Sequence, residues 1–200
     1  MGIKDLKKEY VIKTASELFI KKSVAEVTIK DVADTAGVGE ATVYRYFTNK
    51  KNLVVLSGVY MQQKVYENFY GFSGNSGYER LCAFYNVYLE IFVNHREYYK
   101  FINEFDAFML SEGVESMEEY SDGLEVFRKQ FTDAYSDGIK DGSVKEIKDV
   151  NSFYYSTTHS LMGLCKKLSY GKNIVRQDGT VDKTEEIKTL TEIILTYLKK

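Results

Sequence analysis

The sequence contains no proline and no tryptophan, and only two cysteines and two histidines stand among its 200 residues. Without proline, long helices can run with no breaker in their interiors. An apolar content of 44% is enough for a folded core in a chain of this length. The composition therefore predicts a globular protein with an all-α fold.

Long hydrophobic runs are also missing. No stretch approaches the roughly 18 consecutive apolar residues of a membrane-spanning helix, and the N-terminal sequence MGIKDLKKEY lacks the apolar core of a signal peptide. We therefore expect a cytoplasmic protein with no membrane partner. Cys82 and Cys165 stand alone in apolar helical patterns, which favours small buried hydrophobes over redox or metal roles.

Charge is unevenly distributed along the chain. The total of −2 argues by itself against a nucleic-acid partner. Residues 1–60, however, carry nine Lys and one Arg against seven acidic residues, a net charge of +3, whereas the remainder carries −5. The N-terminal part is therefore suited to binding phosphates, and the rest is not.

A helix-turn-helix pattern lies inside this basic part. Thr28 begins a capping pattern with Asp31 three residues on, which predicts a helix from about residue 29 to 36. Gly37 allows a tight turn, and a second helix opens at Glu40. Apolar residues would form a wedge between two helices joined in this way; they are Ile29, Val32, Ala33, Val38 and Val43.

The remaining helices are predicted from apolar periodicity. A basic amphipathic helix precedes Ser23, and a linking helix runs from about residue 50 to 70. Further helices are expected at about 78–95, 97–111, 118–140, 149–170 and 184–199. The glycine-rich run 71–78 suggests a boundary. We expect a DNA-binding domain at 1–49, the linking helix at 50–70 and a helical ligand-binding and dimerisation domain at 71–200.

Three segments, TIKDVADTAGV, TVYRYF and TNKKNL, together resemble the TetR family of bacterial transcriptional regulators. The resemblance implies an N-terminal three-helix helix-turn-helix domain and a C-terminal helical ligand-binding and dimerisation domain. It also implies a repressor that binds a palindromic operator as a dimer, and a ligand that releases it by shifting the linking helix. Gly39 and Ala41 depart from the serine and glycine of many members, which makes the operator sequence less predictable.

The second helix of the pair is expected in the major groove of double-stranded DNA. For the tyrosines among its residues, packing between helices is the alternative. Phosphate contacts are expected from Thr28, Tyr44, Tyr46 and Lys50, and base or near-base contacts from Glu40, Ala41, Thr42 and Arg45, with phosphate as the alternative for Arg45. Gly39, which can also cap the helix, is expected among the DNA-binding residues.

Two late helices carry apolar residues at alternating spacings of three and four, which suits near-parallel helix packing. A track of small residues, Ser156, Ser160 and Gly163, would allow close approach of another helix. We expect these two helices to pair with their copies in a second chain, which gives a homodimer with a four-helix interface. The alternative is that the apolar residues of the two helices complete the chain's own core. The expected interface residues are Tyr154, Thr157, Leu161, Leu164, Leu168, Ile187, Leu190, Ile194 and Tyr197.

Aromatic residues are abundant, with 17 Tyr and 12 Phe. Rings with polar tips suit a pocket for a small organic ligand, although ordinary core packing is the alternative for each ring. Glu90, Glu104 and Asp106 suggest a cationic ligand, but solvated acids would give the same pattern. The candidate lining residues are Tyr85, Tyr88, Phe105, Phe108, Phe131, Tyr135, Tyr155 and His159.

Other functions receive less support. The two histidines, His95 and His159, lack metal-ligand spacing, and the sequence has no nucleophile elbow and no phosphate-binding loop of the Walker type. We therefore expect no enzymatic activity, no cofactor and no metal. The open alternative is a relative of the same fold that activates transcription or acts through a protein partner without ligand release.

Overall fold

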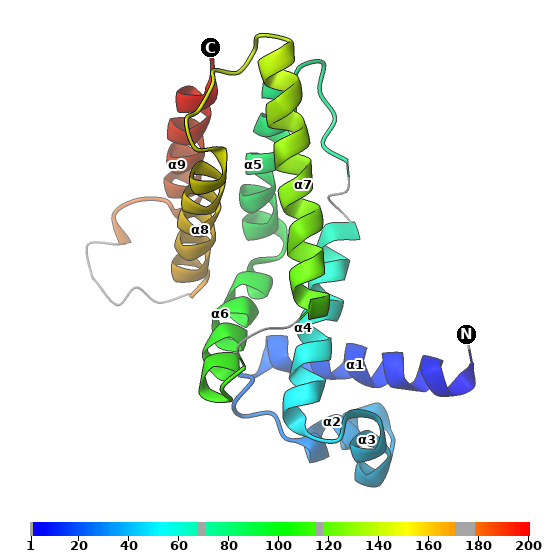
Figure 1. Ribbon diagram of the computed structural model, residues 1–200. Helices are drawn as coiled ribbons and strands as arrows, with labels where there is room; N and C mark the ends of the chain where they lie inside the picture. The colour runs from blue at the N-terminus through cyan, green and yellow to red at the C-terminus, as the bar shows by residue number, and fades with distance from the viewer. Residues whose placement is uncertain (1, 68–70, 115–117, 171–178) are drawn as a thin grey trace. The chain divides into compact units, whose positions relative to one another are not determined.

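The computed structural model describes residues 2–67, 71–114, 118–170 and 179–200. Within these ranges all the regular elements are helices, apart from an isolated β-bridge between Val144 and Lys199, so the predicted all-α class is confirmed. Residues 68–70 of the expected linking helix lie outside the described residues. The helices are α1 (Ile3–Lys21), α2 (Ile29–Ala36), α3 (Glu40–Phe47), α4 (Lys50–Glu67), α5 (Gly77–Asn94), α6 (Arg96–Ser111), α7 (Glu118–Lys140), α8 (Val150–Ser169) and α9 (Lys183–Leu198) (Figure 1).

The chain forms two compact units. The first unit comprises Met1–Glu67 and Lys100–Gly123, and the second comprises Asn68–Tyr99 and Leu124–Lys200. The front of the chain thus shares a unit with most of α6 and the start of α7. The functional division expected from the sequence stays a prediction.

In the first unit, α1 crosses α4 and packs against both α4 and α2 (Figure 1). Val11, Ala15 and Phe19 are buried, and their spacing of four places them on one face of α1. Leu53 and Val54 of α4 are fully buried. The C-terminal half of α1 is therefore fixed by packing.

The rest of the first unit is built on close contacts at two glycines. A Cβ at Gly58 of α4 would lie 2.5 Å from Cε2 of Phe105 on α6, and one at Gly123 of α7 would overlap Oε1 of Gln62. Gln62 is buried, and its amide donates to the carbonyl oxygen of Tyr120 at 3.2 Å. A larger side chain at Gly58 or Gly123 would displace the Phe105 ring or the Gln62 amide, respectively, from these positions.

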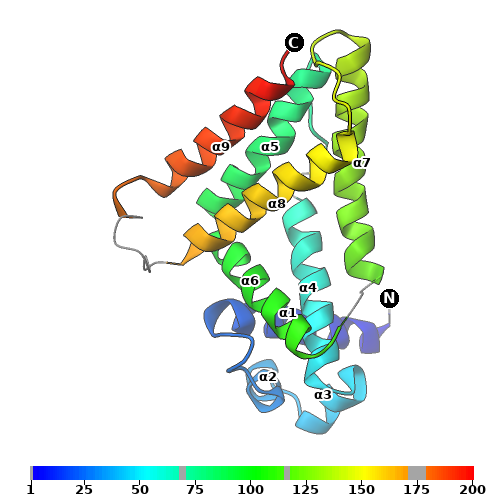
Figure 2. The same cartoon turned by 60° about the vertical axis from the view of Figure 1, so that its left-hand side comes forward.

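In the second unit, α5, α8 and α9 pack against one another (Figure 2). The core next to α5 is aromatic. The ring centroid of Phe84 lies 5.1 Å from that of Tyr85 and 5.5 Å from that of Phe131, and the centroid of Tyr154 lies 5.1 Å from that of Phe131. These spacings are typical of packed aromatic pairs.

The start of α5 meets the end of α7 through two facing glycines. A Cβ at Gly77 would overlap the backbone nitrogen of Gly138, and one at Gly138 would overlap Val144. The N–H of Gly77 donates to a carboxylate oxygen of Asp141 at 2.7 Å, and the N–H of Tyr78 donates to the hydroxyl of Ser143 at 3.1 Å. Residues after α7 thereby bind the free amides at the start of α5.

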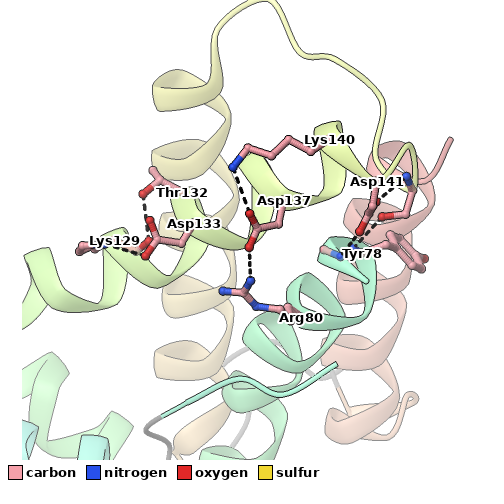
Figure 3. Close-up of polar contacts among 10 residues, drawn as sticks. Tyr78, Arg80, Lys129, Thr132, Asp133, Asp137, Lys140 and Asp141 are labelled. Atoms are coloured by element: carbon pink, nitrogen blue, oxygen red, sulfur yellow. Dashed lines mark hydrogen bonds and ion pairs between the residues drawn. The ribbon is translucent and has the colours of Figure 1, made fainter. Parts of the chain in front are cut away.

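Figure 3 shows the polar contacts beside this junction. Asp137 of α7 pairs with Arg80 of α5 and, at 3.3 Å, with Lys140. Hydrogen bonds from Arg80 and then Lys140 lower the pKa of the Asp137 carboxyl.

Within the described ranges, no helix is both long and apolar enough to cross a membrane.

Candidate DNA interface

The α2–α3 pair has the geometry that its sequence predicts. The Thr28 hydroxyl accepts from the N–H of Asp31 at 3.1 Å, and the Asp31 carboxylate accepts from the N–H of Thr28 at 2.8 Å. Gly37 ends α2 in the left-handed region, with φ 65° and ψ 34°. Local sequence thus sets both ends of α2, because each of these contacts joins residues only a few positions apart.

The buried wedge between α2 and α3 also agrees with the prediction. Val32 and Val43 are fully buried, Ala33 and Phe47 are almost fully buried, and Ile29 is 7% exposed. Val38 is half-buried. With this side of α3 fixed against α2, its opposite side faces solvent.

The exposed side of α3 carries most of the predicted DNA-contact residues. Glu40, Ala41 and Arg45 are exposed, and the ring of Tyr44 is 49% exposed. Thr42 is half-buried at the edge of this side. Glu40, Ala41, Tyr44 and Arg45 therefore form one surface, which we name the α3 face.

Two of the remaining predicted contact residues are Tyr46 and Gly39. Tyr46 is half-buried, its ring meets Phe47 edge-on at 6.0 Å, and the Arg45 guanidinium lies 5.5 Å from its centroid. Gly39 caps α3 without a side chain, and a Cβ there would meet open space. Tyr46 thus combines packing with partial exposure.

The N-terminus of α2 already holds an anion. The Thr28 hydroxyl donates to the Asp31 carboxylate at 2.6 Å. Hydrogen bonds from Thr28 lower the pKa of Asp31, which keeps this carboxylate charged near the positive end of the helix. Thr28 is exposed, but its hydroxyl is committed to the cap.

Lys50 also has a partner within the chain. Its ammonium donates to the carbonyl oxygen of Ala25 at 3.1 Å and lies 5.6 Å from the ring centroid of Phe108. Burial lowers the pKa of Lys50. The sequence identified Lys50 only as a basic residue at the start of a helix. It did not predict the contacts with Ala25 and Phe108, because both residues are distant along the chain.

The predicted ligand residues fall in both units. Tyr85, Tyr88, Phe131 and Tyr135 are buried in the second unit. The Tyr85 hydroxyl is hydrogen-bonded to that of Thr157 at 2.7 Å, and the Tyr135 hydroxyl accepts from the N–H of Ile147 at 2.8 Å. The chain itself therefore satisfies two of the polar tips expected to meet a ligand.

The other four ligand candidates lie elsewhere. Tyr155 and His159 are exposed on α8, with ring centroids 5.6 Å apart. Phe105 and Phe108 belong to the first unit, where Phe105 is almost fully buried and Phe108 half-buried. Ring contacts thus connect Tyr85, Phe131 and Tyr135 with one another. Phe105, Phe108, Tyr155 and His159 do not belong to this cluster.

The three acidic residues that were expected near a cationic ligand have different environments. The Glu104 carboxylate accepts from the N–H of Val24 at 2.9 Å, Asp106 is half-buried, and Glu90 is exposed. Among the described residues, no group of three or more His, Cys, Asp or Glu side chains is arranged to hold a metal ion.

The expected dimer residues fall into three groups by exposure. Thr157, Leu164 and Leu190 are half-buried, and Tyr197 is 51% exposed. Five are buried within the single chain, so their side chains serve its own core, which is the alternative that the sequence left open; these are Tyr154, Leu161, Leu168, Ile187 and Ile194.

Another side of α8 remains exposed. It carries the small residues Ser156, Ser160 and Gly163 together with Tyr155 and His159. From Val150 to Cys165 the helix contains no Asp, Glu, Lys or Arg. An exposed helix face without charge over four turns is typical of an interface core. We name these five residues the α8 face.

Comparison with known proteins agrees with the helix-turn-helix assignment. Residues 11–55 match the family model described as "Bacterial regulatory proteins, tetR family". The match includes the second half of α1, all of α2 and α3, and the start of α4. The description names regulators rather than enzymes.

The proteins similar to this chain include a curated relative and several solved structures. An uncharacterized HTH-type transcriptional regulator, YvkB of Bacillus subtilis (strain 168), is 41% identical over 44 residues, which span 22% of this chain and 23% of the relative. A putative transcriptional regulator from Saccharomonospora viridis, solved in complex with choline, has a TM-score of 0.75 at 16% identity, covering 96% of this chain and 97% of that one.

The regulator FadR from Bacillus subtilis, solved in complex with stearoyl-CoA, gives a TM-score of 0.66 at 15% identity, covering 94% of this chain and 98% of that one. At such identities the two solved structures establish the fold alone. They extend the similarity beyond the front of the chain to nearly its whole length.

Proposed function

Because residues 11–55 match the model of the TetR family of bacterial regulatory proteins, we propose that this chain is a member of that family and regulates transcription by binding an operator through the α3 face. The main support for this proposal is the geometry of α2 and α3. Val32, Ala33 and Val43 are buried between them, and Glu40, Tyr44 and Arg45 are left in solvent on one side. This is the arrangement in which a helix enters the major groove.

Residue roles follow from exposure and chemistry. The Tyr44 side chain is exposed on the α3 face, and its hydroxyl contacts a DNA phosphate. Arg45 and Glu40 reach base edges or the adjacent backbone, and Ala41 allows close approach to the groove. Thr42, at the edge of the face, adjusts preference among sequences. Substitution of Thr42 by Ala should therefore change the order of preferred sites more than the overall affinity.

The operator is bound by a homodimer in this proposal. A single α3 makes few base contacts, and two copies on half-sites about 34–36 Å apart supply the specificity. The α8 face supports this arrangement because it is exposed, uncharged and rich in small residues. The adjacent residues Ile193 and Tyr197 of α9 are 60% and 51% exposed and extend the proposed interface.

A small organic ligand controls DNA binding in this proposal. Support comes from the similar proteins solved with choline and with stearoyl-CoA, and from the aromatic core around Phe84 and Phe131 in the second unit. Release requires that the ligand bind the non-DNA geometry more tightly, since equal affinity for both geometries shifts nothing.

The first experiment is a mobility-shift assay on the DNA flanking the chain's own gene, with the molar mass measured in the same buffer. We expect dimer binding that weakens steeply with added salt and is tighter on one site than on competitor DNA. Absence of binding at low salt would reject the operator proposal and favour the alternative of a protein partner.

The ligand is tested by titration into the protein–DNA complex. Choline and stearoyl-CoA are suitable first probes, followed by compounds found by thermal shift. A compound that raises the melting temperature should also lower DNA affinity. If compounds that bind the chain leave DNA affinity unchanged, the release model is wrong.

A further inference from the structure

The turn between α1 and α2, residues 23–27, is held by two charged side chains from other helices. A carboxylate oxygen of Glu104 on α6 accepts a hydrogen bond from the N–H of Val24 at 2.9 Å. The ammonium of Lys50 at the start of α4 donates to the carbonyl oxygen of Ala25 at 3.1 Å. Successive residues of one turn thus bind an anion and a cation. We name this arrangement the turn clamp.

Within the turn, Ser23 and Glu26 bind each other: the N–H of Ser23 donates to the Glu26 carboxylate at 3.4 Å, and the N–H of Glu26 donates to the Ser23 hydroxyl at 3.1 Å. The contacts from Glu104 and Lys50 add anchors at Val24 and Ala25, between these two residues. The N–H groups of Glu26 and Val27 both donate to the carbonyl oxygen of Ser23, each at 3.2 Å. Val24 and Val27 are buried, so their side chains anchor the turn from beneath. Hydrogen bonds to charged groups are roughly twice as strong as neutral ones, and the clamp supplies two of them.

Both charged groups are held by the same face of α6. Phe108 follows Glu104 by four residues and therefore lies on the same side of the helix, one turn later. The Lys50 ammonium lies 5.6 Å from the Phe108 ring. Both Lys50 and Glu104 are half-buried, which limits the alternative positions open to each side chain.

The turn directly precedes Thr28, the residue that caps α2. A shift of Val24 or Ala25 would move the point at which α2 begins and, through the buried wedge, the α3 face. We infer that Glu104 and Lys50 are positioning residues for DNA binding, which hold the 23–27 turn so that α2 and α3 meet DNA in one orientation. The inference rests on the proposed function, and it assigns the Lys50 ammonium to the chain's own backbone rather than to a DNA phosphate.

Glu104→Ala gives the sharpest test. Removal of an acid from a DNA-binding unit reduces repulsion, so charge alone predicts tighter binding. Loss of positioning predicts the opposite, a weakening of about tenfold. Binding is measured on the DNA flanking the chain's own gene across a salt series. Glu17→Ala is the matched control, because Glu17 is an exposed acid on α1 of the same unit. The Glu17→Ala variant should bind this DNA at least as tightly as the wild type does.

Lys50→Ala separates positioning from phosphate contact. Positioning predicts weaker binding, again by about tenfold, with an unchanged dependence of affinity on salt. A lost phosphate contact would reduce the slope of log K against log salt by about 0.9. Lys13→Ala, an exposed lysine on α1, is the control for loss of positive charge at a distance from the turn.

Two further variants distinguish the clamp from a general loss of structure. Glu104→Gln retains an oxygen that accepts from Val24, so it should recover affinity to within about threefold of the wild type. The Lys50→Ala/Glu104→Ala double variant should bind about as weakly as the weaker single variant, because the two side chains hold one turn.

Amide hydrogen exchange without DNA gives an independent readout. Glu104→Ala should speed exchange at Val24 while leaving the core of α4 protected. The inference is overturned if Glu104→Ala binds DNA as tightly as the wild type, if Lys50→Ala reduces the salt slope by about 0.9, or if Val24 exchange is unchanged. Failure of the wild type to bind DNA would reject the proposed function, and the Val24 exchange would still test the clamp.

Discussion

The α3 face and the α8 face are both exposed helix surfaces, but they differ in chemistry. The α3 face carries Glu40, Tyr44 and Arg45, whereas α8 has no Asp, Glu, Lys or Arg from Val150 to Cys165. Charged and hydrogen-bonding groups suit a polar, wet nucleic-acid surface. An uncharged face with small residues suits a second protein helix. The difference supports the proposal that α3 binds DNA and α8 packs against a second copy of the chain.

The largest expected effect comes from placing a charge on the α8 face. Ser160→Glu should halve the molar mass in solution, because a carboxylate would be buried without a partner. It should also weaken operator binding by about 100-fold or more, since the second half-site would no longer be reached within one molecule. Light scattering and mobility shifts measure the two effects.

Ser136→Glu is the matched control for that variant, because Ser136 is an exposed helical serine of α7 in the same unit. It should leave both mass and affinity unchanged. A Ser160→Glu protein that keeps the mass of the wild type would remove the α8 face from the proposed interface.

The second largest effect is expected on the α3 face. Tyr44→Ala should weaken DNA binding by about tenfold per half-site through loss of a phosphate contact. The weakening should be similar for all DNA sequences, because phosphate contacts carry no base information directly. Competition with specific and unrelated DNA measures both properties.

Tyr10→Ala serves as the comparison for Tyr44→Ala, since Tyr10 is exposed to a similar extent, 53% against 49%, but lies on α1. It should not change affinity. Equal losses in the two variants would show that the effect of Tyr44 is not specific to the α3 face.

The smallest expected effect concerns the start of α3. Gly39→Ser adds a capping hydroxyl, and a Cβ at this position meets open space. The free energy of unfolding should rise by a few tenths of a kcal/mol, as measured by urea denaturation. A decrease would mean that the added side chain disturbs the turn after Gly37. The same variant tests whether this position affects the preferred operator sequence.

Much of the fold could be predicted from the sequence because its causes are local. Thr28 and Asp31 are three residues apart, so their reciprocal capping is visible in the sequence. Gly37 ends α2 because only a residue that tolerates positive φ fits there. Apolar periodicity likewise predicted the bounds of α5 to α9 to within one residue.

The seams of α8 and α9 show the limit of such reasoning. Their spacing predicts helix packing, but it is the same whether the partner is another helix of this chain or a second copy. Tyr154, Leu161 and Ile187 are buried within the single chain, which favours the chain's own core for these residues. The exposed small residues Ser156, Ser160 and Gly163 stay in the proposed dimer interface.

The sequence by itself determined the nine helices found within the described residues, the capped helix-turn-helix and the resemblance of residues 11–55 to TetR-family regulators, because each depends on residues that are neighbours along the chain. The tertiary structure decided which face of each helix remains exposed, and it joined Glu104 to Val24, 80 residues apart. A contact of that kind leaves no periodic pattern, since it depends on how helices fold back on one another rather than on spacing along any one of them.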